Sequence, residues 1–465
     1  MRSVIQFVFV GAALVSMGAG CDWRKLEKAV DKAPVLSVSA PGGYLGNDVG
    51  RLVVALPPPA ELPTVSARFF VASITKVSAA VVDLDAQGKP TVYNVPDSVL
   101  APLTSAPIGS VAWATRPDEA FASVLLGVPE FKTGEFKNGG MFRLKIQPGA
   151  TAPTFVLELP LLPPAALVPG NKAAQFTGIQ GYGRGVASGA VSGNPGFDDW
   201  VVVGNAGVAL IEDGVASLPQ IISPASLCGL DHNPLRLDHL YEFSRTPAIA
   251  DLIPSVPGGE IAVGVPDATG VGKVVILSRE AAGALGCPII ISVAGNPGFG
   301  TSVVAGDVNG DAISDLVVGS PPSNTFVFFG PFVPGVAPVP SLTIPAPATA
   351  TAADFGARTA LMEFDAVPGP EFIVAAPGFA SGATPSAGAV FAFKADGTLL
   401  PLVIADHNPD ESSNLGEGLA IVPFRNAGCA AGAIQSVIVA GGNEEVFTYF
   451  KLPGALPDPR CFPAK

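Results

Sequence analysis

The chain has 465 residues, of which 48% are hydrophobic and 14% charged, and its formal net charge is -13. This length and apolar content are ample for a large buried core. An acidic chain lacks the clustered Lys and Arg that nucleic-acid phosphates require, so nucleic acid is excluded as the expected partner. The 54 Gly and 47 Pro punctuate short Val-, Ile- and Phe-rich runs, which predicts a mostly β protein.

The first twenty residues have the features of an export signal. Arg2 supplies the basic region, and the apolar run from Val4 to Val15 is too short to remain as a membrane-spanning helix. Small residues and then Cys21 follow, an ending that resembles the lipobox of bacterial lipoproteins, although Gly18 stands where a lipobox usually has an aliphatic residue. The resemblance implies that Cys21 is lipidated and becomes the first mature residue. The alternative is ordinary signal cleavage nearby, with Cys21 left as a thiol.

These features predict a three-part chain. Residues 1–20 are expected to be a signal peptide, residues 21–42 a lipid-anchored tether, and residues 43–465 one folded domain. The sequence contains no second long apolar segment, so attachment to the membrane is expected through the lipid alone. We therefore expect the protein in the bacterial envelope, at the outer membrane or cell surface, with secretion as the alternative.

A weak repeat recurs through the expected domain at intervals of roughly 60 residues. Each unit begins with an apolar or aromatic residue followed by Gly or Ser, continues through a strand of small residues and a turn, and then enters a β-rich run. The pairs that begin the units are Ile108-Gly109, Tyr182-Gly183, Phe243-Ser244, Phe299-Gly300, Phe355-Gly356 and Leu415-Gly416, with Leu45-Gly46 as a fainter seventh. Another β segment follows each central run, so a unit holds about four strands, the content of one propeller blade.

A ring of such units would bury the two faces of each sheet against its neighbours. The sequence therefore predicts an all-β fold, a seven-bladed β-propeller with six blades as the alternative. The pattern resembles the FG-GAP repeat of the propeller in integrin α subunits, over roughly residues 43–455, and the unit from Phe299 is the most similar. Sandwich domains in a row are the competing all-β arrangement, but they do not explain a unit of this length.

The unit from Phe299 contains the loop "GDVNGDAISD", in which oxygen-bearing side chains alternate. Asp307, Asn309, Asp311 and Asp315 fall at positions 1, 3, 5 and 9, and Ile313 at position 7 would offer its backbone carbonyl. Calcium requires six to eight oxygen ligands, and three carboxylates offset its charge. The loop therefore predicts a Ca²⁺ site that joins two strands of one blade. The alternative is a loop of Asx-turns that caps itself without metal.

The other units have lost most of these residues. In the unit from Phe355, Glu363, Asp365 and Glu371 take positions 1, 3 and 9, which leaves a second cation site open. In the unit from Tyr182, Asp198 and Asp199 are interpreted as the remnant of such a loop. The remaining units are expected to be metal-free.

Four cysteines remain after Cys21, and an even number in an exported chain permits two disulfides. The pairs closest in sequence are Cys228 with Cys287 and Cys429 with Cys461, one of three possible connectivities. Free buried thiols are the alternative.

Catalysis is not expected. The sequence has three His and neither a nucleophile elbow, an HExxH motif nor a P-loop. The tetrapeptide "DHNP" occurs twice, at 231–234 and 406–409, and is interpreted as a polar turn between units. FG-GAP proteins that are hydrolases carry their chemistry in an added domain.

We therefore expect a non-catalytic recognition or adhesion module whose propeller face binds a protein or glycan. The alternative is a structural component of the envelope, and a hydrolase is a remote third possibility.

Overall fold

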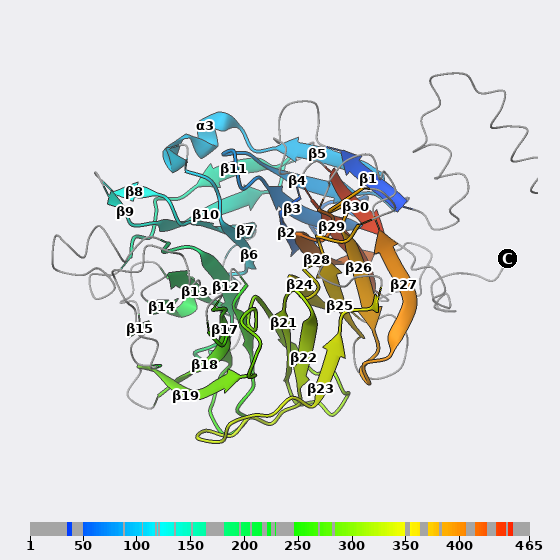
Figure 1. The fold of residues 1–465 in the computed structure, drawn as a ribbon. Helices are drawn as coiled ribbons and strands as arrows, with labels where there is room; N and C mark the ends of the chain where they lie inside the picture. The colour runs from blue at the N-terminus through cyan, green and yellow to red at the C-terminus, as the bar shows by residue number, and fades with distance from the viewer. Residues whose placement is uncertain are drawn as a thin grey trace, which may run out of the picture.

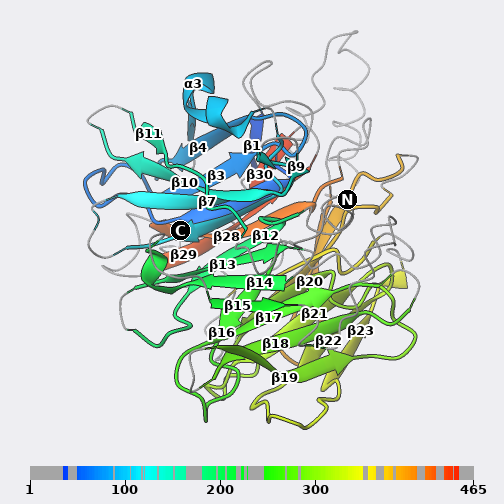
Figure 2. The same cartoon turned by 90° about the vertical axis from the view of Figure 1, so that its left-hand side faces the viewer.

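The structure of the chain is a computed structural model, shown in Figures 1 and 2. The structure describes residues 35–39, 50–86, 89–104, 106–116, 119, 121–133, 136–149, 152–163, 181–194, 197–204, 207–215, 221–224, 228, 246–267, 270–280, 284–348, 354–362, 371–380, 384–405, 414–425, 434–442 and 445–449.

The strands form seven four-stranded antiparallel sheets, numbered here in chain order. The first and second sheets contain β2 (Leu52–Leu56), β3 (Ala67–Ala72), β4 (Ala79–Leu84) and β5 (Pro90–Asn94), then β6 (Ser110–Ala114), β7 (Ala122–Val128), β10 (Gly140–Gln147) and β11 (Thr154–Leu157). The third and fourth contain β12 (Gly185–Gly189), β13 (Asp199–Gly204), β14 (Gly207–Ile211) and β15 (Ile221–Pro224), then β16 (Ala248–Ala250), β17 (Glu260–Val265), β18 (Lys273–Arg279) and β19 (Leu285–Ser292).

The fifth and sixth sheets contain β20 (Ser302–Gly306), β21 (Asp315–Ser320), β22 (Asn324–Phe328) and β23 (Leu342–Pro345), then β24 (Arg358–Met362), β25 (Glu371–Ala376), β26 (Ala389–Phe393) and β27 (Leu399–Ala405). The seventh contains β28 (Gly418–Arg425), β29 (Ile434–Gly441), β30 (Glu445–Tyr449) and β1 (Val35–Ser39). The short strands β8 (Lys132–Thr133) and β9 (Phe136–Lys137) pair with each other, and α3 (Asp97–Leu100) is a single turn of helix.

The sheets close into a ring around their innermost strands (Figure 1). The inner strands contact one another in the series β2, β6, β12, β16, β20, β24 and β28, and β28 returns to β2. Seven clusters of buried apolar side chains occur, one between each pair of neighbouring sheets, including the seventh and the first. Each sheet thus covers both of its faces with its neighbours, and the predicted all-β propeller is confirmed.

The seventh sheet is the only one of those described whose strands come from both ends of the chain. β30 is bordered by β1, in antiparallel register from Val35 opposite Tyr449 to Ser39 opposite Glu445. A count of contiguous four-strand units therefore gives six, whereas the count of sheets gives seven. β1 lies within residues 21–42, which the sequence analysis assigned to a tether, so the propeller extends into that segment. The pairing ties the two ends of the propeller together and covers the edge of β30.

The aromatic-glycine pairs occupy equivalent places in successive units. Phe299 and Phe355 are fully buried between sheets. The glycines that follow them, Gly300 and Gly356, have φ of +91° and +97°, a conformation that favours glycine. The N–H of Gly300 bonds to the carbonyl of Gly319 on β21 at 3.1 Å, and Gly109, Gly356 and Gly416 make the corresponding bond to the second strand of their own units.

A second set of glycines allows the sheets to approach closely. A Cβ atom added at Gly319 on β21 would lie 1.9 Å from the carbonyl oxygen of Gly356, which belongs to the next sheet. The same relation holds between Gly127 and Gly183 and between Gly264 and Gly300. In the first unit, Gly50 is the residue whose carbonyl oxygen lies against the glycines of β28 and β29. The sequence prediction of Leu45-Gly46 falls outside the described residues, and the described start of the first unit is Gly50.

Cys228 and Cys287 form a disulfide, as the pairing closest in sequence predicted. Cys287 lies on β19, the outermost strand of the fourth sheet, and Cys228 follows the outermost strand of the third. The bond therefore links two neighbouring sheets at the rim. Within the part of the chain that the structure describes, no helix is long and apolar enough to cross a membrane.

Candidate functional site

The loop predicted to bind calcium joins β20 to β21 and is organised by its own carboxylates. Asp315, the first residue of β21, is fully buried. Its Oδ2 accepts hydrogen bonds from the N–H groups of Val308 (2.8 Å) and Asn309 (3.2 Å), and its Oδ1 accepts one from Gly330 (2.8 Å). One side chain thus holds both the loop between the first and second strands and the loop that follows the third strand.

The remaining polar residues of the loop form Asx-turns. Asp307 accepts hydrogen bonds from the N–H groups of Gly310, Asp311 and Ala312, at 2.7, 3.0 and 2.8 Å. Asn309 donates its side-chain N–H to Asp311 at 2.9 Å, and Asp311 accepts the N–H of Ile313 at 2.8 Å. The structure therefore brings all five predicted residues into one compact loop, in the self-capped arrangement that the sequence left open as an alternative.

The donor chemistry of this loop fits calcium. Carboxylate, amide and carbonyl oxygens are the ligands that this ion prefers. Each carboxylate oxygen has two lone pairs, so an oxygen that accepts one N–H retains capacity for a cation. Among the described residues, no group of three or more His, Cys, Asp or Glu side chains lies together closely enough to hold a metal ion.

A buried carboxylate recurs at the start of the second strand in three other sheets, at Asp199, Glu260 and Glu371. Asp199, the first residue of β13, accepts the N–H groups of Val191 (2.7 Å) and Asp213 (2.8 Å). Glu260, the first residue of β17, accepts those of Leu252 and Ile253, both at 2.8 Å. In these two sheets the carboxylate holds the preceding loop through backbone N–H groups, as Asp315 does in the fifth.

Burial shifts the titration of two of these groups. It raises the pKa of Asp315, against the opposing effect of the backbone hydrogen bonds from Gly330, Val308 and Asn309. It also raises the pKa of Glu260, whose Oε1 is buried without a hydrogen-bond partner in the described part of the chain. A carboxyl favours its protonated form when one oxygen accepts hydrogen bonds and the other is buried without a hydrogen-bond partner.

A cleft opens where the first and second sheets meet, with a volume of about 460 Å³. Its wall includes the loop after β2 (57–61), residues of β6 and of the segment that leads into β7, and the end of β10. Those of the second sheet are Trp113, Thr115, Arg116, Glu119, Phe121, Ala122, Ile146 and Pro148. Trp113 is 36% exposed, an uncommon exposure for a large aromatic side chain, and Phe121 lines the same space. Three consecutive prolines, Pro57 to Pro59, form the opposite rim.

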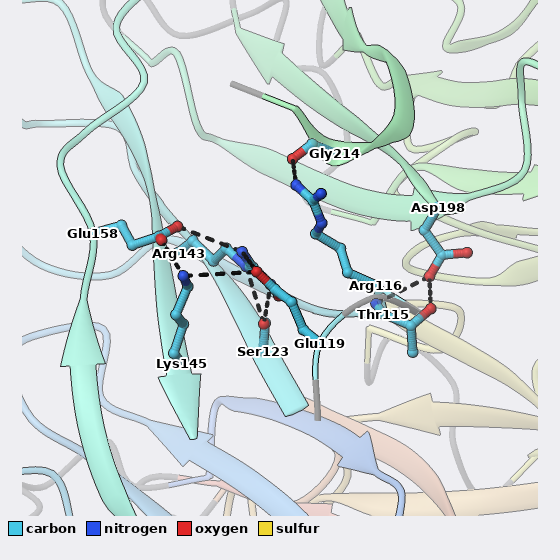
Figure 3. Close-up of polar contacts among 9 residues, drawn as sticks. All are labelled: Thr115, Arg116, Glu119, Ser123, Arg143, Lys145, Glu158, Asp198 and Gly214. Carbon is cyan, nitrogen blue, oxygen red and sulfur yellow. Dashed lines mark hydrogen bonds and ion pairs between the residues drawn. The ribbon is translucent and has the colours of Figure 1, made fainter. Parts of the chain in front are cut away.

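Charged side chains beside the cleft are paired and held in place (Figure 3). Arg143 is 4% exposed and donates to Glu119 through Nη1 at 3.1 Å and to Ser123 through Nε at 3.0 Å. Lys145 forms ion pairs with Glu119 and Glu158, and its ammonium lies 5.2 Å from the centre of the Phe121 ring. At the floor, Arg68 forms a buried bidentate pair with Asp83, at 2.6 and 2.7 Å.

Contacts with the third sheet fix the loop that carries the cleft. Thr115 donates both its backbone N–H and its hydroxyl to the carboxylate of Asp198. Arg116 donates to the carbonyl of Gly214 at 3.2 Å (Figure 3). Asp198 therefore connects the second and third sheets. The cleft is a preformed apolar surface with paired charges at its edge, an arrangement suited to recognition.

Sequence reasoning missed both the recurring carboxylate and the cleft. The carboxylate could have been found from the acidic residue that begins four second strands, at Asp199, Glu260, Asp315 and Glu371. The cleft had no comparable signal, because its residues come from two units. Several predicted residues lie outside the described residues, namely Cys21, Glu363, Asp365, Cys429, Cys461, His232, His239 and His407. Glu371 begins β25 and is buried.

Comparison with known families agrees with the repeat. Residues 299–331 match the FG-GAP repeat, the segment from the Phe299-Gly300 pair through the acidic loop to the end of the third strand. No curated protein matches the chain. The matched segment is one unit of the ring described above, and the propeller arrangement extends the likeness beyond it. The chain is a β-propeller that contains an FG-GAP repeat.

Proposed function

We propose that the protein is an exported, lipid-anchored, calcium-binding propeller that acts as a non-catalytic recognition or adhesion module at the bacterial cell envelope. The FG-GAP propeller is typically an interaction module and typically non-catalytic, which supports the general class. The cleft beside Trp113 is the feature that supports a specific binding site, because a preformed pocket with an exposed aromatic side chain is uncommon on a surface without a ligand.

Two features support export. The N-terminal twenty residues read as a signal that ends at Cys21. The disulfide between Cys228 and Cys287 is a bond that forms in oxidising compartments outside the cytoplasm. A lipid on Cys21 would attach the propeller to the membrane through the segment before β1.

Calcium is proposed to bind the loop between β20 and β21. The side chains of Asp307, Asn309, Asp311 and Asp315 and the carbonyl of Ile313 would hold it. The ion would supply positive charge to a loop that carries three carboxylates within nine residues, and so stabilise the loop. The residues of the chain would perform no chemistry on it.

The proposed recognition is tested by capture from envelope fractions. Immobilised protein is incubated with detergent-solubilised envelope, in calcium and in chelator, and bound proteins and glycans are quantified. Trp113→Ala should lose a stoichiometric ligand that the wild type retains, while Val271→Asp, on the loop between β17 and β18, should retain it. A ligand captured equally by wild type and Trp113→Ala would contradict recognition at the cleft.

Lipidation is tested separately by acyl labelling and by inhibition of the lipoprotein signal peptidase with globomycin. Wild type should incorporate the acyl label and accumulate as a precursor under the inhibitor. A Cys21→Ala protein that is processed and retained in the membrane like wild type would remove the lipid anchor from the account.

A further inference from the structure

The loop between β22 and β23 exposes an apolar ridge, defined here as residues 331–340. Val333, Val336 and Val339 are 52%, 58% and 78% exposed, and no residue between Leu316 and Ala353 is charged. Single exposed apolar residues are ordinary, but three valines on one uncharged segment form a continuous surface.

The ridge is held rigidly by its backbone. The side chain of Phe332 is buried, and its N–H bonds to the carbonyl of Leu252 at 3.0 Å. The N–H of Gly335 bonds to Pro288 at 3.3 Å, and that of Val336 closes a turn onto Val333 at 3.1 Å. A segment fixed in this way loses little conformational entropy when a partner covers it.

Proline determines which side chains share a face of the ridge. Pro338 and Pro340 have a fixed φ, and the residues before them, Ala337 and Val339, are restricted to extended conformations. These restrictions favour the polyproline II conformation, which has three residues per turn. In that conformation Val336 and Val339, which are three residues apart and both exposed, share one side.

Polyproline II segments are recognised by grooves lined with aromatic side chains. The cleft beside Trp113 offers such a groove, with Phe121 along it and apolar walls. Arg143, Lys145 and Glu119 beside it are paired with one another, so an uncharged ligand leaves these charges compensated. The ridge and the cleft are therefore complementary in chemistry.

The two surfaces lie at the same end of the ring. In antiparallel sheets of four successive strands, the loop from the first to the second strand and the loop from the third to the fourth lie at one end. The cleft uses the former in the first and second sheets, and the ridge is the latter in the fifth. Figures 1 and 2 show β22 and β23 far from β7 and β10, so the ridge cannot enter the cleft of its own chain.

We propose that the ridge of one copy binds in the Trp113 cleft of a second copy, which deepens the recognition proposed above and rests on its assignment of the cleft. When two copies stack face to face, a two-fold axis in the plane between them can bring the ridge of each copy to the cleft of the other, because both surfaces lie at the same end of the ring. Each copy then supplies one ridge and one cleft, so the contact is made twice and the assembly closes as a face-to-face dimer.

The test is the oligomeric state of the full chain carrying Cys21→Ser, which prevents a lipid from causing association. Sedimentation equilibrium over roughly a 100-fold concentration range should give a dimer and no larger species. Trp113→Ala in the cleft and Val339→Asp on the ridge should each raise the dimer dissociation constant by roughly 30-fold or more. Val271→Asp, an exposed valine at the other end of the ring, should leave it unchanged.

The outcomes separate this inference from the recognition function. A monomer at every concentration overturns the dimer, and so does a dimer that persists in Val339→Asp or Trp113→Ala with its circular dichroism intact. A series of growing oligomers also overturns it, because a closed two-fold contact stops at two. If the wild type is a monomer but Trp113→Ala still loses an envelope ligand, the dimer fails and the recognition function stands.

Discussion

Gly319 shows how a single residue sets the spacing between sheets. It lies on β21 where the carbonyl of Gly356, from the next sheet, would be 1.9 Å from an added Cβ. Backbone atoms cannot move aside as a flexible side chain can, so a methyl group here must separate two sheets. The repeated glycine at the end of the second strand is therefore explained by packing between units.

We expect Gly319→Ala to destabilise the protein by at least about 3 kcal/mol, because the clash is with backbone. The control is Gly295→Ala, where φ is +77° and nothing lies within 4 Å of an added Cβ. That variant should lose only about 1 kcal/mol, the cost of a left-handed alanine. Denaturant unfolding measures both, and equal losses would contradict the packing explanation.

Glu260 gives a prediction about pH. Its pKa in the folded state is raised above the ordinary 4.5, so the folded protein binds the proton more tightly than the unfolded chain. The stability that this proton contributes is complete below the unfolded pKa and is lost as the pH rises through the folded pKa. Glu260→Gln cannot lose a proton. The melting temperature of wild type minus that of the variant should therefore fall as the pH rises from the ordinary pKa of 4.5 through the raised pKa of the folded state. A difference that is constant, or that grows with pH, would show that the carboxyl is ionised in the folded protein.

The loop between β20 and β21 combines two kinds of stabilisation. Asp315 holds it from the buried side, whereas Asp311 lies on the exposed side and bonds only within the loop. A metal-independent contribution is expected from the first residue, as in the sheets of Asp199 and Glu260, and a metal-dependent contribution from the second.

We expect calcium to raise the melting temperature of wild type and chelator to lower it. Asp311→Ala should remove this response, because one carboxylate ligand and its charge are lost. Asp396→Ala is the control, since Asp396 caps a turn elsewhere through the N–H of Thr398 at 2.8 Å. If wild type and Asp311→Ala melt together at every calcium concentration, the loop has no structural calcium.

Elements whose signal lies within one unit could be predicted from the sequence. The third strand of each unit was visible as a short apolar run, and the loop at Asp307 was visible because its ligands are adjacent in sequence. Glu260 was not recognised, since a lone acidic residue before a strand does not distinguish a buried cap from an exposed charge. The role of β1 was not predicted because its partner, β30, lies at the opposite end of the chain.

At the scale of the whole molecule, the ring is stabilised at its rim and at its closure. The disulfide between Cys228 and Cys287 spans 59 residues and links the third and fourth sheets. Crosslinking a loop of this length lowers the entropy of the unfolded chain, a stabilisation of about 2 to 4 kcal/mol.

Cys287→Ala should therefore lower the free energy of unfolding by about 2 to 4 kcal/mol under oxidising conditions. Reductant should destabilise the wild type more than the variant, by a similar amount. Both proteins are compared by denaturant unfolding with and without reductant. An equal effect of reductant on the two proteins would assign the sensitivity to other cysteines.

A crystal structure of the protein grown with calcium tests the central claim most directly. It should show seven four-stranded sheets around one axis, β1 paired with β30, and a calcium ion held by the loop from Asp307 to Asp315. Sheets arranged in a row without the contact between β2 and β28 would contradict the propeller. A loop that keeps its hydrogen bonds and excludes the ion at saturating calcium would contradict the metal site.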